Sequence, residues 1–239
     1  MKDAVRGNFD ESVTAYDAYE RRTRRFSSLA RLLWAEMRRR SERSLDTVLD
    51  AGAGSGASTG VLEGGASTLV ALDISRGMLQ ANDAGTGVQG DLDSLPLVGG
   101  SLDAIAYTAS LFLVPEPELA IREAARVLRP GGVVGAVVPV GWFDDDGRDV
   151  FASLGRESRS PADPDDVIGA VSEAFDTVEG TWRFASTADD IRLFHTIPAL
   201  GARLYPRATT EDRARNVRDL LEPVDGTYEE RWRWVVGSS

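Results

Sequence analysis

The chain has 239 residues, of which 42% are hydrophobic and 27% charged, a composition that is ordinary for a globular protein and excludes a disordered one. Its 38 acidic and 27 basic residues give a formal net charge of −11. Cysteine is absent and there is one histidine, which excludes disulfides, cysteine nucleophiles and metal sites built from thiolates or several histidines, so we expect no metal.

The acidic balance is informative about habitat. It resembles that of proteins from salt-loving microbes, and we expect a halophilic source, in which surface charge maintains solubility and says little about the partner. Residues 21–43 depart from this trend with several arginines that offer contacts for phosphates. Because a run of charge is more often a solvated helix face, we do not expect nucleic acid as the partner.

No segment has the character of a membrane span or a signal peptide. The longest apolar run, 131–140, is far shorter than the ~20 residues that a spanning helix needs. We therefore expect a cytoplasmic protein without a membrane span.

The first part of the chain predicts helices followed by a parallel sheet. Segments 9–19 and 26–37 have apolar residues at helical spacing, and we expect them to form an N-terminal helical cap. From 45 to 140, short β-rich runs alternate with helix-length segments, which is typical of a doubly wound α/β fold. The predicted strands are 46–50, 68–73, 88–90, 102–109 and 133–138, and the strongest helix is 116–128.

The later part gives a weaker pattern. We expect residues 144–225 to cover the ligand and to select the substrate. The predicted elements are helices at 164–174, 188–204 and 210–221, a β-like stretch at 175–184 and a Trp-rich edge strand at 228–236. We expect a single domain over 1–239, divided into a helical cap at 1–44, a cofactor-binding core at 45–140 and a substrate-covering part at 141–239.

A buried strand runs into a glycine-rich turn at residues 48–56. Glycines at 52, 54 and 56 let the backbone approach a ligand closely, because a Cβ at any of them would occupy the ligand's place. The looser dinucleotide pattern is also satisfied, which leaves a nicotinamide oxidoreductase open. Asp73 closes the second strand about twenty residues later, where its carboxylate can accept hydrogen bonds from both ribose hydroxyls in either class.

Four segments around this turn occur in a characteristic order. They are Asp50 before the glycines, the run 73–79, the run 90–97 and the helix end 126–132. Together they resemble the class I S-adenosylmethionine-dependent methyltransferase family, especially its small-molecule branch. The resemblance implies a Rossmann-like, mostly parallel sheet of seven strands with late helical insertions, S-adenosylmethionine as cofactor and S-adenosylhomocysteine as product.

The resemblance also implies a set of cofactor contacts. Asp50 would orient the turn near the cationic methionine end, while Asp73 would hold the ribose. Ile74 and Met78 would pack on the adenine, and Asp91, with Leu92 beside it, would meet the adenine amino group. The cofactor-binding residues expected are thus Tyr16, Asp50, Gly52, Gly54, Gly56, Asp73, Ile74, Met78, Asp91, Leu92 and Thr108.

The N-terminus adds a finer resemblance. Phe9 followed by Tyr16 and Asp17 is similar to the opening of biotin-synthesis and quinone-pathway methyltransferases, which implies that Tyr16 contacts the methionine carboxylate. The alternative is an aromatic side chain that packs the cap on the core. Tyr19 and the two arginines after Glu20 depart from that pattern, so the substrate of those enzymes does not transfer.

Candidate catalytic residues lie outside these motifs. His195 is the only residue with an ordinary pKa near neutrality, and we consider it as a general base for a phenol or carbon acid; the alternative is a packed core histidine. On family grounds, Tyr107 and Ser110 are expected to face the acceptor, with the alternative that they only shape its pocket. Trp142 is a candidate for the pocket wall because it lies just beyond the fifth strand.

The sequence therefore predicts an enzyme that transfers a methyl group by in-line displacement to a small organic or carrier-bound acyl acceptor. One alternative is an RNA or protein methyltransferase that docks through residues 21–43. Another is a cofactor-binding regulatory protein without turnover.

Overall fold

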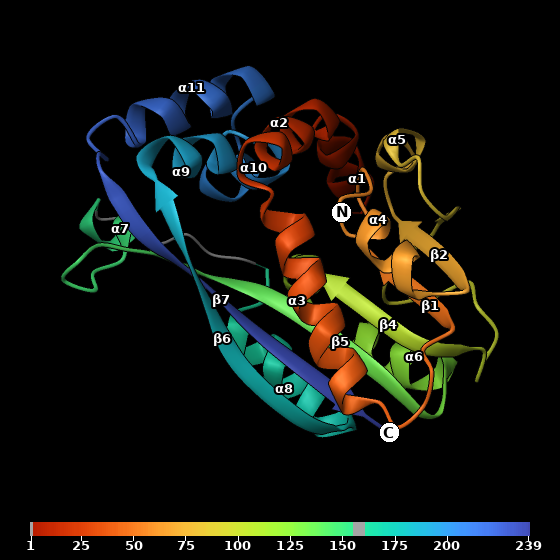
Figure 1. The fold of residues 1–239 in the computed structure, drawn as a ribbon. Helices are drawn as coiled ribbons and strands as arrows, with labels where there is room; N and C mark the ends of the chain where they lie inside the picture. Colours follow the sequence, from red (N-terminus) through yellow and green to blue (C-terminus); the bar gives the residue numbers. More distant parts are fainter. Residues whose placement is uncertain (1, 155–160) are drawn as a thin grey trace.

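The computed structural model describes residues 2–154 and 161–239. Within these residues seven strands form one sheet, in the order β3-β2-β1-β4-β5-β7-β6 (Figure 1). The strands are β1 (Thr47–Ala51), β2 (Thr68–Asp73), β3 (Thr86–Gln89), β4 (Leu102–Thr108), β5 (Leu128–Phe143), β6 (Asp176–Thr187) and β7 (Thr227–Ser238). The first five pair in parallel, and β7 runs antiparallel to both of its neighbours, which confirms the predicted doubly wound, mostly parallel fold.

Helices cover both faces of the sheet and the carboxyl ends of its strands. They are α1 (Lys2–Asp10), α2 (Val13–Thr23), α3 (Arg25–Arg40), α4 (Thr59–Leu62), α5 (Arg76–Ala81), α6 (Pro117–Val127), α7 (Val150–Ser153), α8 (Pro164–Ala174), α9 (Ala188–His195), α10 (Pro198–Leu204) and α11 (Thr210–Leu220). Two short 3₁₀ turns, η1 (Glu63–Gly65) and η2 (Leu111–Leu113), complete the described elements.

Successive side chains of the central strands point to opposite faces of the sheet, so the apolar core has two parts. Leu49 and Ile105 belong to an apolar cluster with residues of α6 and α8, whereas their neighbours Val48 and Ala104 belong to a second cluster with residues of α3. Successive side chains of a strand point to opposite faces, so strands that are apolar at every position require a helix layer on each side. The helix predicted at 26–37 as part of a cap is thus corrected: as α3 it covers a face of the sheet.

A third apolar cluster lies over the carboxyl ends of the strands, where α2 packs with α9, α10 and α11 (Figure 1). Tyr19 of α2 and Phe194 of α9 meet at its centre, with ring centroids 5.2 Å apart. This cluster fixes the N-terminal helices to the late part of the chain and so forms the roof of the sheet edge at which parallel α/β folds bind ligands.

Two predictions about the late elements were wrong in detail. Residues 228–236 do not form an edge strand, because β7 inserts between β5 and β6, which leaves β6 at the edge. The helix predicted at 188–204 is two helices, α9 and α10, because Pro198 begins the second and disfavours helical geometry at Ile197. Residues 155–160, within the region predicted to cover the ligand, lie outside the described residues.

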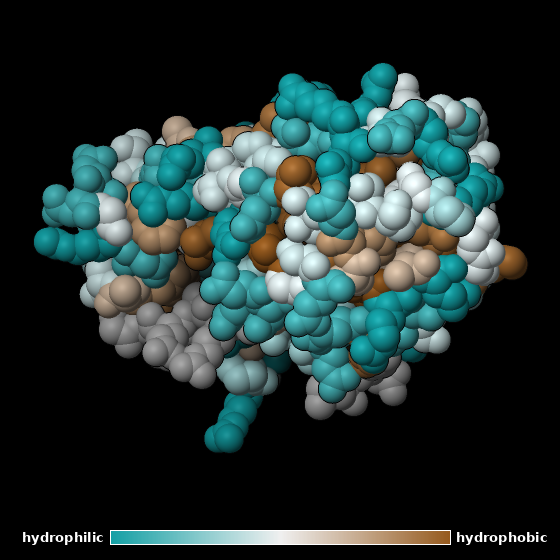
Figure 2. Space-filling model, turned by 90° about the horizontal axis from the view of Figure 1, so that it is seen from below, coloured by the Kyte–Doolittle hydropathy of each residue, from teal (hydrophilic) through white to brown (hydrophobic). Residues whose placement is uncertain are grey.

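Hydrophilic residues cover most of the face shown in Figure 2, and apolar residues appear there in small, separate areas. None of the described helices combines the length and the apolar character that a membrane crossing requires. The halophilic source stays a prediction.

Candidate active site

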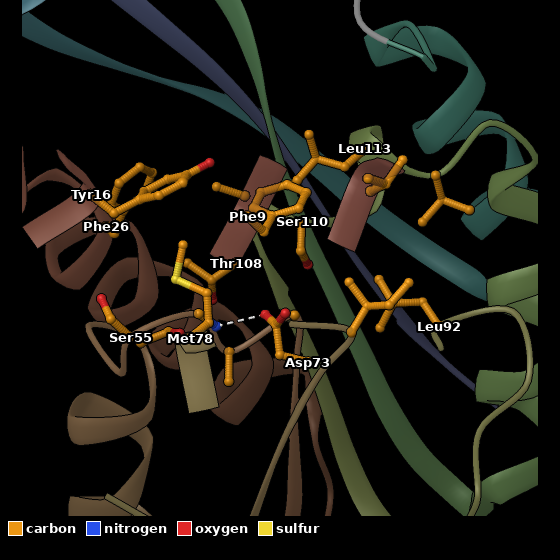
Figure 3. Close-up of a pocket in the computed structure, with 18 of the residues that line it drawn as sticks. Phe9, Tyr16, Phe26, Ser55, Asp73, Met78, Leu92, Thr108, Ser110 and Leu113 are labelled. Atoms are coloured by element: carbon orange, nitrogen blue, oxygen red, sulfur yellow. Dashed lines mark hydrogen bonds between the residues drawn. The ribbon is translucent and has the colours of Figure 1, made fainter. Parts of the chain in front are cut away.

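A cavity of about 650 Å³ opens at the carboxyl ends of β1, β2 and β4, beneath α1 and α2 (Figure 3). Its volume is in the range of small-ligand sites. The sequence-predicted residues that line it are Tyr16, Gly52, Gly54, Asp73, Ile74, Met78, Asp91, Leu92, Thr108 and Ser110. Sequence reasoning missed further lining residues, among them Val5, Glu20, Phe26, Ser55, Leu113, Val114 and Pro161. Most of these carry no motif, so only the fold brings them to the site.

The three glycines of the turn have different reasons to be glycine. All adopt left-handed backbone angles, with φ of 77° at Gly52, 54° at Gly54 and 101° at Gly56. A Cβ on Gly52 would lie 2.4 Å from Cβ of Ser110, and one on Gly56 would lie 2.6 Å from Oδ1 of Asn82, whereas one on Gly54 would meet no atom within 4 Å. The expectation that each glycine leaves room for the ligand is therefore corrected: Gly54 alone of the three faces open space.

Asp73 is held in position by the backbone around it. Its Oδ2 accepts a hydrogen bond from the amide of Gly54 at 2.9 Å (Figure 3), and its Oδ1 accepts one from the amide of Ser75 at 2.8 Å. Burial raises the pKa of this carboxyl against the opposing effect of these amides. The carboxylate points into the cavity and retains lone pairs for further donors.

Asp50 lies beneath the turn and does not line the cavity. Its Oδ2 accepts hydrogen bonds from the hydroxyls of Ser58 at 2.7 Å and Thr59 at 2.8 Å, so it does orient the segment that follows the glycines. Its Oδ1 is buried and has no hydrogen-bond partner within the described residues. Burial raises the pKa of Asp50 to about 6, so a cationic ligand above the turn would favour the ionised form.

The side of the cavity near β2 and β3 is suited to a flat apolar ring. Met78 is 2% exposed, and Ile74 and Leu92 line the cavity with it. Asp91 lines the same cavity, and its Oδ1 accepts from the amide of Asp93 at 3.4 Å, which begins a short turn. The four residues expected to contact adenine therefore line the same cavity.

The N-terminal helices are fastened to the two ligand loops by carboxylates. Asp17 of α2 accepts from the hydroxyl of Ser55 at 2.6 Å, next to the glycine turn. Asp10 of α1 accepts from the hydroxyl of Ser75 and from the amide of Gly77, at the start of α5. The cap is thereby positioned on the cavity by specific hydrogen bonds that the sequence motif did not predict.

The aromatic pair of the N-terminal motif meets in the cavity wall. The rings of Phe9 and Tyr16 stack with centroids 6.3 Å apart, and Phe26 lies 5.6 Å from Tyr16 on its other side. Burial raises the pKa of Tyr16, so its hydroxyl stays protonated and able to donate. Both sequence interpretations thus describe part of its environment, since Tyr16 packs among aromatic rings and also lines the cavity.

Tyr107 does not face the cavity, and the expectation that it meets the acceptor is corrected. It is fully buried against α6, where its hydroxyl donates to the carbonyl of Ala120 at 3.3 Å. Strand alternation places its neighbour Thr108 on the cavity side instead, with Oγ1 buried and without a partner among the described residues. Ala109 then takes a left-handed φ of 56°, which turns Ser110 back to donate to the carbonyl of Ala51 at 2.5 Å.

His195 and Trp142 line a second, smaller cavity and are absent from the wall of the first. Nδ1 of His195 lies 2.8 Å from the carbonyl oxygen of Ile191, an acceptor, so Nδ1 carries the proton and donates. Burial lowers the pKa of His195 to about 4, and the ring is neutral at pH 7.

Taken together, the first cavity fits an adenosyl ligand with a positive centre. It has an apolar slot for a ring, a fixed carboxylate for hydroxyls, open space above Gly54 for close backbone approach, and buried negative charge beneath the turn. A pyrophosphate would gain nothing from that buried carboxylate.

Comparison with known proteins agrees with this chemistry. The methyltransferase domain family matches residues 49–135. The chain is 33% identical to demethylmenaquinone methyltransferase of Mycolicibacterium vanbaalenii over 174 residues, which cover 72% of each chain. It is 27% identical to malonyl-[acyl-carrier protein] O-methyltransferase of a Methylovorus species over 95% of this chain and 82% of that one.

The fold alone is less specific. The YcgJ protein of Bacillus subtilis superposes with a TM-score of 0.60 at 18% identity, covering 87% of this chain and 97% of the other. The [4+2]-cyclase SpnF, at 18% identity, shares the fold with a TM-score of 0.53 over 87% of this chain and 80% of the other. The sequence relatives and the motifs in the first cavity decide where the fold does not: the chain belongs to the class I S-adenosylmethionine-dependent methyltransferase family and is such an enzyme, with S-adenosylmethionine as its cofactor.

Proposed function

We propose that the methyl acceptor is a small, largely apolar molecule with a hydroxylated aromatic ring of the quinol type. The observation that carries this proposal is the wall of the first cavity, where Phe9, Tyr16, Phe26 and Leu113 supply apolar and aromatic surface beside the carboxylates. Relatives named demethylmenaquinone methyltransferase at 33% and 32% identity, each over 72% of this chain, support the same class of acceptor.

In this proposal the predicted cofactor residues act as follows. Asp73 accepts from the ribose hydroxyls, while Asp91 accepts from the adenine amino group beside Met78. Asp50 stabilises positive charge through the turn. The bound cofactor supplies a methyl group on a sulfonium, a good leaving group, so the chain needs only to align the acceptor and exclude water.

A carrier-bound acyl acceptor is the second candidate. The malonyl-[acyl-carrier protein] relative aligns over 95% of this chain. Its lower identity, 27%, and the aromatic cavity wall place it behind the quinol-type acceptor.

The arginine segment gives little support to a nucleic-acid substrate. Within the described residues, four of its arginines have carboxylate partners, which lowers the positive charge available to phosphates. These pairs are Arg22 with Asp190, Arg25 with Glu230, Arg39 with Glu36 and Arg40 with Asp176.

We include in the proposal a single domain over residues 1–239 and a cytoplasmic location. The apolar cluster that joins α2 to α9, α10 and α11 supports the first, because it makes the cap and the late helices one packed unit. The location stays a prediction from the sequence.

The test is turnover with an acceptor panel. Purified protein is incubated with S-adenosylmethionine and a reduced naphthoquinone, a malonylated carrier protein or bulk transfer RNA, and S-adenosylhomocysteine is measured by mass spectrometry. We expect product with the naphthoquinol only. Product with the carrier or the RNA alone would replace the proposed acceptor, and cofactor binding without turnover on any broad panel would favour a regulatory protein.

A further inference from the structure

A second cavity of about 290 Å³ lies at the carboxyl end of β5, enclosed by α7, α9, α10 and the start of α8. Its volume is at the lower limit of small-ligand sites and suits one or two fused rings. Aromatic, apolar and polar side chains alternate around it. They include Trp142, Asp149, Phe151, Asp163, Phe194, His195, Leu200 and Arg203.

His195 presents a hydrogen-bond acceptor in this cavity. The donation from Nδ1 to Ile191 leaves the lone pair on Nε2, and no donor among the described residues reaches it. The rings of Phe151, Trp142 and Phe194 surround the imidazole with centroid separations of 4.6, 4.8 and 5.1 Å, so its orientation is fixed. A rigid, uncharged acceptor inside an aromatic enclosure selects a ligand that carries a donor.

Trp142, whose ring packs against His195, supplies a donor in the wall of the same cavity. The side chain is 4% exposed, and its Nε1 is buried without a hydrogen-bond partner in the described part of the chain. A buried indole N–H without a partner costs free energy, which makes it unusual unless a ligand oxygen occupies the position. A hydroxyl donates one hydrogen bond and accepts others, so it matches both Nε2 and Nε1.

Arg203 lies near both cavities. It lines the second one, and its guanidinium lies 4.6 Å from the ring centroid of Phe112, next to Leu113 in the wall of the first. Its positive charge favours an oxyanion. The same wall holds two carboxylates, Asp149 and Asp163. Asp149 caps α7, where its Oδ1 accepts hydrogen bonds from the amides of Phe151 and Ala152.

We propose that the second cavity is the subsite that recognises the acidic hydroxyl of the acceptor, a phenol or enol, with His195 accepting from the hydroxyl and Trp142 donating to its oxygen. The inference rests on the proposed quinol-type acceptor and adds where its hydroxyl binds. His195 therefore holds the hydroxyl through Nε2 as a neutral hydrogen-bond acceptor, and Arg203 in the same wall stabilises negative charge that develops on the acceptor oxygen.

Because His195 is the only histidine of the chain, nuclear magnetic resonance with ¹⁵N-labelled histidine reports on this site alone. The probe is 2-naphthol, and 2-methoxynaphthalene, which lacks the hydroxyl, is the control; both are titrated with S-adenosylhomocysteine present. We expect the Nε2 resonance to move with 2-naphthol and not with the control, while Nδ1 stays protonated. A proton on Nε2 in the free protein, or bound 2-naphthol that leaves the resonance unmoved, would overturn the assignment.

The matched variants are Trp142→Phe and, as a control outside the cavity, Trp234→Phe on β7. Calorimetry should show at least fivefold weaker 2-naphthol binding for the first and no change for the second, with equal affinity for S-adenosylhomocysteine in both. Equal 2-naphthol affinity in both variants would contradict the subsite. Naphthoquinol turnover without any response of His195 would reject the subsite and keep the proposed acceptor. A response of His195 without naphthoquinol turnover would keep the subsite and reject the proposed acceptor.

Discussion

Asp50 carries a buried carboxylate that destabilises the free protein. Its pKa is about 6 in the fold against 3.8 for an ordinary aspartate, and one unit corresponds to about 1.4 kcal/mol. Between these pH values the folded state binds more protons than the unfolded state, so stability falls as pH rises through this window. At pH 8 the ionised group therefore costs about 3 kcal/mol, chiefly from desolvation.

We predict that Asp50→Asn raises the thermal unfolding temperature of the free protein at pH 8. The amide oxygen can still accept from Ser58 and Thr59, and the buried charge is gone. At pH 5 the wild-type carboxyl is mostly protonated, and the difference should shrink. Calorimetric titration should show weaker binding of S-adenosylmethionine. A variant that is less stable by the same amount at both pH values would show that Asp50 acts only as a hydrogen-bond acceptor.

Gly54 and Gly52 offer a matched pair of substitutions. Gly54→Ala should keep the fold, at a cost of about 1 to 2 kcal/mol for the left-handed backbone, and should weaken S-adenosylhomocysteine at least tenfold because the new Cβ occupies open cavity space. Gly52→Ala should instead lower the unfolding temperature more strongly, since its Cβ meets Ser110 at 2.4 Å. Unfolding scans and titration calorimetry separate the two effects. Equal affinity in Gly54→Ala would place the ligand elsewhere.

For individual residues, the sequence predicted which positions belong to the ligand loops better than it predicted which way their side chains point. Asp73, Met78 and Leu92 line one cavity as expected, because the motif specifies both the strand ends and the loops that follow them. The prediction that Tyr107 faces the acceptor was wrong. Every residue of its strand is buried, so no alternation of polar and apolar residues shows which face each side chain takes. The side-chain oxygen of Asn82 leaves no room for a Cβ at position 56, which explains Gly56, but no sequence motif marks Asn82.

At the scale of elements, the first two helices depend on single carboxylates for their docking. Asp17→Ala removes the acceptor of the Ser55 hydroxyl and loosens α2 over the glycine turn. We predict a loss of about 1 kcal/mol in S-adenosylhomocysteine affinity, roughly fivefold, with little change in global unfolding, because the apolar cluster of α2 is intact. Asp83→Ala, an exposed neighbour of the site, is the control. A large fall in unfolding temperature without an affinity change would assign Asp17 to stability alone.

The start of α3 is tied to β7 by a buried ion pair. Arg25 and Glu230 are 8% and 1% exposed in their side chains, with an N to O distance of 2.8 Å, and the indole of Trp232 also donates to Glu230 at 2.6 Å. Glu230→Ala leaves the guanidinium buried without its charge partner, and we predict a loss of about 3 to 5 kcal/mol in unfolding free energy by urea titration.

The double variant Arg25→Met with Glu230→Leu is the comparison. Because it removes both charges and keeps apolar volume, it should be much closer to the wild type than Glu230→Ala alone. If the double variant loses as much unfolding free energy as Glu230→Ala, the ion pair itself stabilises the fold more than the apolar side chains that replace it.

Element prediction succeeded where local signals are strong. Residues 164–174 match α8 because Pro164 follows an Asp163 cap in a capping box that the sequence displays. The pairing of β7 between β5 and β6 has no such local signal, since it is decided by which apolar faces can be buried together.

Across the molecule, the sheet order brings the ends of β1, β2 and β4 together under a roof made from the N-terminal helices and from α9, α10 and α11. The composition predicted a globular protein, and the alternation of β-rich and helix-length segments predicted the doubly wound sheet. The roof was predicted only in outline, because the contact between α2 and the late helices joins residues more than 150 positions apart. We propose that the cofactor and the ring of the acceptor bind in the first cavity and that the acceptor hydroxyl is recognised in the second, at the same edge of the sheet.

Calorimetric titration with S-adenosylhomocysteine tests most directly whether the first cavity holds the cofactor. The wild type should bind one molecule, Asp73→Ala should bind about 1.5 to 3 kcal/mol more weakly because a charge-assisted hydrogen-bond acceptor is lost, and Asp83→Ala should match the wild type. NADH should give no heat of binding. Unchanged affinity in Asp73→Ala, or binding of NADH in place of S-adenosylhomocysteine, would contradict the proposed cofactor site.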